Sequence, residues 1–408
     1  MTIIRSYKVI SVVIFSAIMV VMCNREAIFG KKKTDKDYPL VKKLIPLPGR
    51  PMAMALSPDG LQLAVLHSEG LSLVNLSSQS SVATVPAHPN SVLPELFFAN
   101  GGSELYFTNQ EDRIDRLNLE NSTPEVWITS AKEAVGRGEI SGLALSPSGH
   151  FAAVGVKGVD QVIVLELARR LEVLRISGVK SPNGLVFSRD GRELWIGQKC
   201  QETQPGNPKS STLDNRESNC PQGAGLVSVY DLEHQMLKAR IQVDNFSGRL
   251  YLSRDGARIF IAGTDGLTIT TINVVTREIA EEISLESIRR GRVSSSPVAL
   301  SLDLDGKRLY AALTDVPWLA VIALGSQSSK SLKVESSKVE GMIPIPGKPQ
   351  AVGLDLQGTR LLVALSDPID WSGTSQTSAP GPGAVALIEL PSAKQWSSWL
   401  GLYLMGHS

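Results

Sequence analysis

A single short pattern recurs along this chain: an apolar stretch runs into a tight turn that holds a glycine, and a second apolar stretch follows. The first copy is PMAMALSPDGLQLAVLHSEGLSLVNL, residues 51–76. Seven copies are visible, spaced 42 to 65 residues apart, with turn glycines at Gly60, Gly102, Gly149, Gly191, Gly256, Gly306 and Gly358. Self-similarity on this length scale indicates one repeat fold and not several unrelated domains.

The turn residues explain why each copy should be a β-hairpin. In Ser57-Pro58-Asp59-Gly60, proline restricts φ, aspartate can bond its own backbone, and glycine accepts positive φ. Short strands rich in Val, Ile and Leu flank the turns, and two further strands complete most copies. Because only nine Phe, seven Tyr and six Trp are present, the core should be aliphatic. Units of four short strands predict an all-β fold, a seven-bladed β-propeller.

The two ends of the chain should meet in one blade. LIPLPGRP at 44–51 closely matches MIPIPGKP at 342–349, where it forms the outer strand of one blade. The last copy stops after its third strand, AVALIEL, so the N-terminal segment would complete that blade and remove an open sheet edge. The rival for this position is the tail segment 399–405, WLGLYLM. The propeller is predicted to span residues 41–393.

The repeat resembles the YVTN-type propellers of bacterial and archaeal cell envelopes. SPDGLQLAVL, GGSELYFTN and GLVSVYDLEHQ carry this likeness, which extends over residues 44–390. A WD-repeat signature with its terminal Trp-Asp is missing from the sequence, although the blades should be WD40-like in architecture. The resemblance implies the fold and an envelope setting, and says little about activity.

The N-terminus is predicted to direct export. Residues 1–23 form a signal peptide or membrane anchor: Arg5 and Lys8 precede an uncharged run over 9–22. Val20-Val21-Met22-Cys23 resembles a lipobox, which makes Cys23 the expected lipidation site, although Met22 departs from the usual small residue. An uncleaved anchor and ordinary cleavage remain alternatives. Residues 24–40 would be a polar tether.

Composition limits the chemistry that the chain can perform. With 41 Lys plus Arg against 40 Asp plus Glu, the net charge is +1, so a nucleic-acid partner is not expected. The histidines are scattered, at His67, His88, His150, His234 and His407, and no Cys-x-x-Cys-His motif occurs. We therefore expect no cofactor, no metal site and no catalytic residue, and an enzyme is the less favoured interpretation.

Ligands of propellers usually lie over the central channel. Counting eight residues back from each turn glycine samples this ring, and Ser141, Asn183 and Gln350 are its polar members. Pro182-Asn183-Gly184 resembles a metal-ligand segment of gluconolactonase-type enzymes, but matching acids are missing and Glu95 is one position out of register. A lactonase or sugar-acid hydrolase that uses the channel is thus the alternative function.

Two insertions should emerge on one face of the ring. The first is bounded by Cys200 and Cys220, whose disulfide in an exported protein would stabilise the fold by on the order of 3 kcal/mol. The second, 366–383, offers Asp367, Asp370 and Trp371 as rim-loop contacts. An apolar tail covers 394–408. We expect an exported, envelope-tethered binding or scaffold module, anchored by lipid or helix in the periplasm or at the outer surface, whose protein or small-molecule partner is unknown.

Overall fold

The structure is a computed structural model of the full chain. It describes residues 40–391 except for 89–93, 110–112, 121–122, 130–137, 200–223, 245, 247, 264–267, 287–295, 315, 326–335 and 370–381. The predicted signal segment 1–23, with Cys23, lies outside the described residues, and so does the C-terminal tail.

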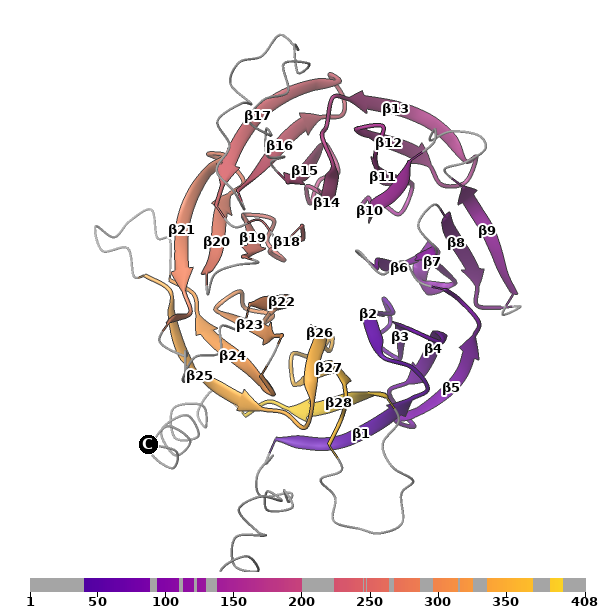
Figure 1. The fold of residues 1–408 in the computed structure, drawn as a ribbon, viewed down its shortest axis with the longest axis vertical. Coiled ribbons are helices and arrows are strands. Elements are labelled where there is room, and N and C mark those ends of the chain that lie inside the picture. Colours follow the sequence, from indigo (N-terminus) through magenta and orange to yellow (C-terminus); the bar gives the residue numbers. More distant parts are fainter. Residues whose placement is uncertain are drawn as a thin grey trace, which may run out of the picture. The chain divides into compact units, whose positions relative to one another are not determined.

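Seven antiparallel sheets of four strands each stand around a central axis (Figure 1). From the innermost strand outwards, the first three blades contain β2 (Pro51–Leu56), β3 (Gln62–His67), β4 (Gly70–Asn75), β5 (Ser80–Val85); β6 (Leu96–Ala99), β7 (Glu104–Asn109), β8 (Arg113–Asn118), β9 (Thr123–Thr129); β10 (Glu139–Leu145), β11 (Phe151–Lys157), β12 (Gln161–Glu166), β13 (Leu171–Ser177). A short 3₁₀ turn, η2 (Asn100–Gly102), joins β6 to β7.

Blades 4 to 6 repeat the same order. Their strands are β14 (Pro182–Phe187), β15 (Glu193–Lys199), β16 (Gly225–Asp231), β17 (Met236–Val243); β18 (Leu250–Leu252), β19 (Arg258–Ala262), β20 (Thr268–Asn273), β21 (Glu278–Ser284); β22 (Pro297–Leu302), β23 (Arg308–Leu313), β24 (Trp318–Ala323), β25 (Lys338–Pro344). The prediction of an all-β, seven-bladed propeller is confirmed. No helix among the described residues is long and apolar enough to cross a membrane.

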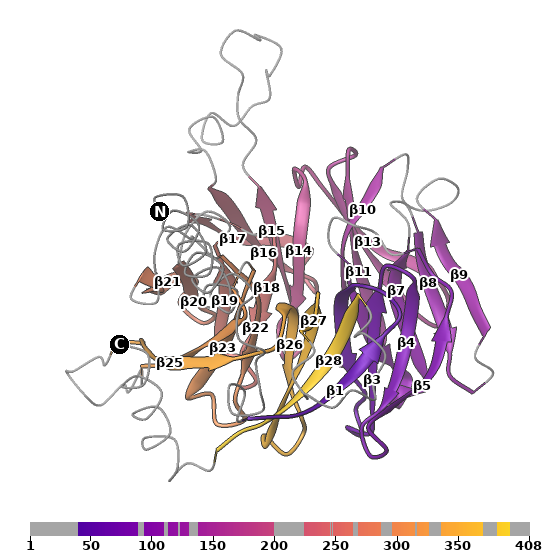
Figure 2. The ribbon, with the colours of Figure 1, turned by 60° about the horizontal axis from the view of Figure 1, so that its bottom comes forward.

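Blade 7 is assembled from both ends of the described chain. Its sheet order is β26 (Lys348–Leu354), β27 (Arg360–Ser366), β28 (Gly383–Glu389) and then β1 (Val41–Leu47). Leu44 lies opposite Ala386 and Ile45 opposite Val385, and Figure 2 shows β1 alongside β28. Ile45 is only 2% exposed, so the N-terminal strand contributes to the core and also covers the edge of β28.

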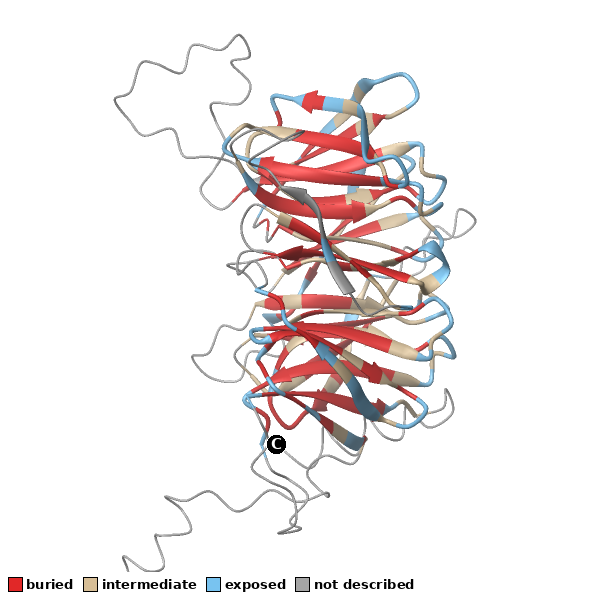
Figure 3. Ribbon diagram, turned by 90° about the vertical axis from the view of Figure 1, so that its right-hand side faces the viewer, coloured by how far each residue is buried: buried red, intermediate tan, exposed pale blue. Residues whose placement is uncertain are grey.

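The apolar core lies between the blades. Each of the described clusters of buried side chains joins two neighbours: Leu66 and Leu71 of blade 1, for example, pack with Phe107 of blade 2. Another cluster joins Ile45 in blade 7 to Leu63 in blade 1. Figure 3 shows the buried residues following the strands through the ring. Blades whose faces are both covered explain the near-continuous apolar runs of the middle strands.

The turns between first and second strands form one face of the ring, which we call the turn face. In blade 1, the Ser57 carbonyl accepts from the Gly60 N–H, and the Ser57 hydroxyl accepts from the Gln62 N–H. The Ser57 hydroxyl also donates to Asp59, which holds the pKa of that carboxyl below its usual range. Blades 4 and 5 use the same Ser and Asp positions. The turns are therefore built by local hydrogen bonds.

Side chains of the turn face also connect one blade to the next. Leu356 of blade 7 lies against Gly60 of blade 1, where a Cβ would come within 2.8 Å of its Cδ1. Leu304 of blade 6 covers Gly358 in the same way. Blade 1 turns its proline, Pro58, towards Gly102 of blade 2. The glycines thus serve the hairpin through their positive φ and make room for the preceding blade.

Candidate functional site

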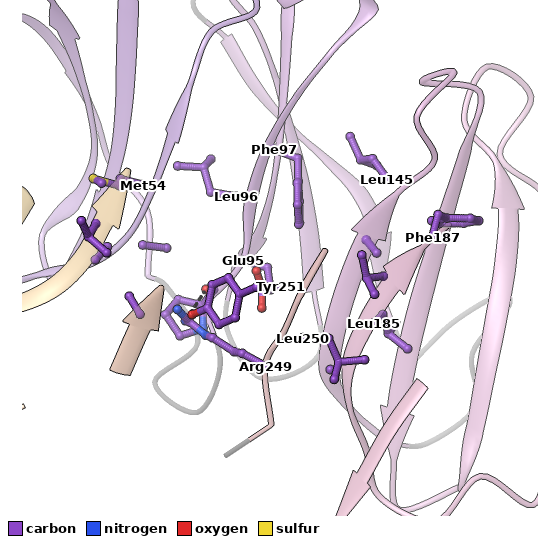
Figure 4. Close-up of a pocket in the computed structure, with 18 residues that line it drawn as sticks. Met54, Glu95, Leu96, Phe97, Leu145, Leu185, Phe187, Arg249, Leu250 and Tyr251 are labelled. Atoms are coloured by element: carbon purple, nitrogen blue, oxygen red, sulfur yellow. Dashed lines mark hydrogen bonds between the residues drawn. The ribbon is translucent and has the colours of Figure 1, made fainter. Parts of the chain in front are cut away.

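A cavity of about 280 Å³ lies at the centre of the ring (Figure 4). Inner strands of all seven blades contribute to its wall, mostly with Ala, Leu, Val, Met and Phe side chains. Only three side chains in the lining bear ionisable groups: Glu95, Arg249 and Tyr251. We call these three residues the channel cluster. Apolar walls with a few convergent polar groups are typical of small-molecule sites.

Glu95 and Arg249 occupy the same position of the repeat in two different blades, seven residues before the turn glycine. The other five blades have only small residues there, Ala53, Gly142, Gly184, Ala299 and Ala351. Blades 2 and 5 face one another across the ring in Figure 1. The small residues leave the centre open, and the two long charged side chains extend into it.

The close approach of the inner strands explains part of this pattern. A Cβ on Gly184 would lie 2.4 Å from the carbonyl oxygen of Gly248 in the neighbouring blade. A larger residue would push blades 4 and 5 apart at the channel, so glycine is required.

Arg249 connects opposite sides of the channel. Its Nη2 donates to the carbonyl oxygen of Pro94 at 3.2 Å, which joins blade 5 to blade 2. Tyr251 donates through its hydroxyl to the carbonyl oxygen of Val298 in blade 6, at 3.4 Å. Figure 4 shows Glu95, Arg249 and Tyr251 gathered at one place in the cavity. The cluster and its two carbonyl partners therefore come from blades 2, 5 and 6.

The backbone of Glu95 is held in place by its neighbouring strand. The Glu95 N–H donates to Thr108 Oγ1 at 3.0 Å, and the Glu95 carbonyl accepts from the Thr108 N–H at 3.0 Å. These two bonds fix the point from which the side chain enters the cavity. Taken as a whole residue, Glu95 is of intermediate exposure.

Burial changes the proton affinity of the whole cluster. It raises the pKa of the Glu95 carboxyl, which the charge of Arg249 only partly opposes. It also raises the pKa of Tyr251, again against the effect of Arg249. For Arg249, burial alone would lower the pKa, but the Glu95 charge and Tyr251 together raise it. Arg249 is thus a fixed positive charge, and Glu95 is a carboxyl whose proton is held more tightly than usual.

The residues predicted at the channel mouth lie one position before this ring. Ser141, Asn183 and Gln350 coincide with register shifts between the first and second strands of their blades, where β-bulges re-aim side chains. Ser141 donates to the carbonyl oxygen of Pro182, and Gln350 Nε2 donates to Ser366 Oγ at 3.1 Å. None of the three lines the cavity. As ligand contacts they stay predictions.

Sequence reasoning considered Glu95 but missed Arg249 and Tyr251. The signal that could have found them was the next column of the repeat alignment, where two opposite charges interrupt a column of Ala and Gly. The position eight residues before the glycine carries no such contrast.

The other predicted site residues are mostly outside the described part of the chain. This applies to the predicted disulfide pair Cys200 and Cys220, and to Asp370 and Trp371. Asp367 is described: its Oδ1 accepts from Arg50 Nη2 at 3.2 Å. It lies where the chain leaves β27, at the start of the second insertion.

His67 and Ser72 form a buried pair that resembles a catalytic base and nucleophile. His67 Nε2 lies 2.8 Å from Ser72 Oγ, which lies 3.1 Å from Thr84 Oγ1. However, His67 Nδ1 accepts from the backbone N–H of Glu69, so the ring proton is on Nε2 and points at the serine. Burial also lowers the pKa of His67. The histidine is a donor here and cannot remove the serine proton.

Nowhere in the described ranges do three His, Cys, Asp or Glu side chains come together as metal ligands would. The group of carboxylates that the lactonase interpretation expects near Asn183 is thus not seen in those ranges. The lactonase alternative stays a prediction.

No protein-family model matches the chain, and no curated protein matches its sequence. Solved structures do resemble it. Hydrazine synthase of Kuenenia stuttgartiensis aligns with a TM-score of 0.60 at 18% identity, covering 84% of this chain and 96% of that one. The Cps50 (Swd1) β-propeller domain of Myceliophteria thermophila aligns with a TM-score of 0.59 at 13% identity, covering 86% of this chain and 99% of that one.

A chain of the mitotic checkpoint complex is also similar, with a TM-score of 0.56 at 15% identity, covering 88% of this chain and 95% of that one. At these identities the three structures show the β-propeller fold alone. Their activities and assemblies differ, so the likeness does not select a function for this chain. The YVTN repeat type also stays a prediction.

Proposed function

We propose that this protein is an exported, envelope-tethered β-propeller that acts as a binding module. Its partner is recognised on the face opposite the turn face, which we call the connection face. This face carries the links between second and third strands and the links from one blade to the next. A closed ring of seven sheets supplies a rigid platform for loops of different lengths.

The lengths of the links between second and third strands carry the proposal. On the turn face, the first and second strands of blade 1 are joined by residues 57–61, and the other blades keep similarly short turns. On the connection face, the second and third strands of blade 1 are joined by residues 68–69. The same link takes 200–224 in blade 4 and 367–382 in blade 7. The turn face also has a long link, residues 324–337 between the third and fourth strands of blade 6. Two long links at the same step of the repeat are what a recognition surface on a rigid ring would have, and both lie on the connection face.

The position of β1 supports the tethering part of the proposal. β1 is the outermost strand of blade 7 and begins at Val41 (Figure 1), directly after the predicted tether 24–40. A tether that joins the ring at its periphery leaves the channel and the connection face free. The signal-like N-terminus and the lipobox-like residues before Cys23 supply the route of export.

Mass spectrometry of the mature N-terminus tests the tether. We expect the chain to start at a lipid-modified Cys23. Cys23→Ala should move the protein from the membrane fraction to the soluble fraction of the envelope. An unmodified start at another residue would exclude lipidation, and a full-length chain recovered from the cytoplasm would contradict export.

Photo-crosslinking in living cells tests the recognition face. A photoreactive amino acid placed at position 367, on the connection face, should give adducts with a discrete partner. The same amino acid at position 305, an exposed turn-face position, is the matched control. Equal adducts from both positions, or adducts from 305 alone, would overturn the assignment of the connection face.

A further inference from the structure

The central cavity has a charged end and an apolar end. Glu95 and Arg249 immediately precede β6 and β18, so they lie towards the connection face. Leu145 and Phe187 are the last residues of β10 and β14, close to the turn face, and both line the same cavity. Figure 4 shows Leu145 and Phe187 set apart from the channel cluster. A ligand that fills this cavity would present a polar head to one end and an apolar body to the other.

The two charges at the polar end shift each other's pKa, but they are not in direct contact. Among the described residues, no ion pair or hydrogen bond joins the Glu95 carboxylate to Arg249, and none of them donates to that carboxylate. Arg249 uses Nη2 for the Pro94 carbonyl and interacts with the Tyr251 side chain, but a guanidinium has five N–H donors in a fixed fork. Charges removed from bulk water are usually paired. This cavity therefore leaves both an acceptor and a donor set for a ligand.

A ligand with one charge would satisfy only half of this arrangement. An amine would approach Glu95 and be repelled by Arg249, and a carboxylate would meet the opposite problem. A zwitterion satisfies both, because its ammonium can face Glu95 while its carboxylate faces the Arg249 fork. A cavity of about 280 Å³ lies at the small end of ligand sites, which suits a metabolite rather than a peptide.

We infer that the channel binds a free α-amino acid with an aliphatic side chain. The ammonium lies against Glu95, the carboxylate against Arg249 with Tyr251 beside it, and the side chain among Leu96, Phe97 and Leu185. This site is independent of the partner proposed for the connection face. Either can fail without the other.

The inference predicts a ranking of three related probes. Isothermal titration of the intact wild-type protein at neutral pH would compare L-leucine with isopentylamine, which lacks the carboxylate, and 4-methylpentanoate, which lacks the ammonium. We expect leucine to bind at least about tenfold more tightly than either. Absence of leucine binding, or equal binding of all three probes, would overturn the inference.

Substitutions that remove one charge of the site should each weaken the binding of a different single-charge probe. Glu95→Gln should weaken the binding of leucine by about tenfold or more, and should leave the affinity for 4-methylpentanoate unchanged or higher. Arg249→Gln should weaken the binding of leucine by a similar factor and leave the affinity for isopentylamine unchanged. If both variants weaken all three probes equally, the residues shape the channel without reading the ligand, and the inference fails.

Two exposed substitutions supply the matched controls. Glu278→Gln and Arg254→Gln make the same changes of charge at exposed positions away from the channel, and leucine binding should be unaffected. Thermal unfolding of each variant shows whether the ring has kept its stability. Should Arg249→Gln fail to fold, the ranking of probes on the wild-type protein still decides the inference.

Discussion

The turn face and the connection face are made by the same strands, yet they follow different rules. The turns of blades 1, 4 and 5 are held by Ser and Asp hydrogen bonds, and several turns touch the turn of a neighbouring blade, as Leu356 touches Gly60. The connection face has links of two residues in one blade and many more in another, and the charged residues of the channel lie towards it. The turns between first and second strands thus connect neighbouring blades, whereas the links between second and third strands differ widely in length. Both faces depend on the closure of the ring by β1.

Both faces should weaken together when the closing strand is damaged. Ile45→Ala removes a side chain that packs between blades 7 and 1, and should lower the free energy of unfolding by about 2–5 kcal/mol. Lys43→Ala, at an exposed position of the same strand, should change the free energy of unfolding by no more than about 0.5 kcal/mol. Chemical denaturation measures both. Similar values for the two variants would show that β1 is dispensable.

The turn face should be sensitive to its neighbouring blade as well as to its own φ. Gly149→Ala introduces a side chain at φ +70° with no atom nearby, and should cost about 1–2 kcal/mol of backbone strain. Gly60→Ala has a similar φ of +73° but meets Leu356, so it should cost more. In a Leu356→Ala background the difference should disappear. If Gly60→Ala and Gly149→Ala are equal from the start, the contact between the turns has no energetic role.

The channel cluster should give a pH dependence of stability opposite to that of the turns. Burial raises the folded-state pKa of Glu95, so its stabilising contribution is complete below the ordinary value of 4.5 and is lost as the pH rises through the folded-state pKa. Glu95→Gln should remove this loss, and the variant should gain stability relative to wild type towards neutral pH. Unfolding curves from pH 4 to 8 measure the effect. A loss of stability in the variant near neutral pH would contradict it.

In the turns, the folded-state pKa of Asp59, Asp190 and Asp255 is lowered by the neighbouring serine hydroxyls. Their contribution is therefore present above the ordinary value of 3.8 and is lost as the pH falls through the folded-state pKa. Ser57→Ala, made together with the equivalent changes at 188 and 253, should flatten the acid side of the stability curve. An unchanged curve below pH 4 would mean that the hydroxyls do not stabilise the charged form.

The smallest effect should come from the connection face. Asp367→Asn removes an exposed ion pair with Arg50, and surface pairs are worth less than about 1 kcal/mol. We expect the free energy of unfolding to fall by no more than this amount at low salt. The loss should be smaller at high salt, because salt screens the ion pair. A larger loss in denaturant would show that the start of the second insertion is part of the structural ring.

Much of the architecture was predictable because its determinants are local. The tetrapeptide at 57–60 specifies a hairpin through neighbours only a few residues away, and its recurrence gives the number of blades. The likeness of segments 44–51 and 342–349 was a second useful signal. In the structure β1 and β25 hold equivalent outermost positions, in blades 7 and 6.

The candidate site was predicted less well. The expected contacts Ser141, Asn183 and Gln350 were chosen by counting along the chain, and the count was one residue short of the cavity wall. A β-bulge lies at this point in several blades, and a bulge changes which side chain reaches the axis. Register of this kind depends on strand pairing across a blade, which spacing alone does not specify.

From the sequence alone, we could determine the blade, its turns, the number of repeats and the aliphatic core, because a strand and its hairpin partner are close in the chain. Tertiary structure decided which residues meet at the axis. Pro94 and Arg249 stand 155 positions apart, and no local pattern relates them. They meet because seven sheets close into a ring, and the ring brings blades 2 and 5 to opposite sides of one narrow channel.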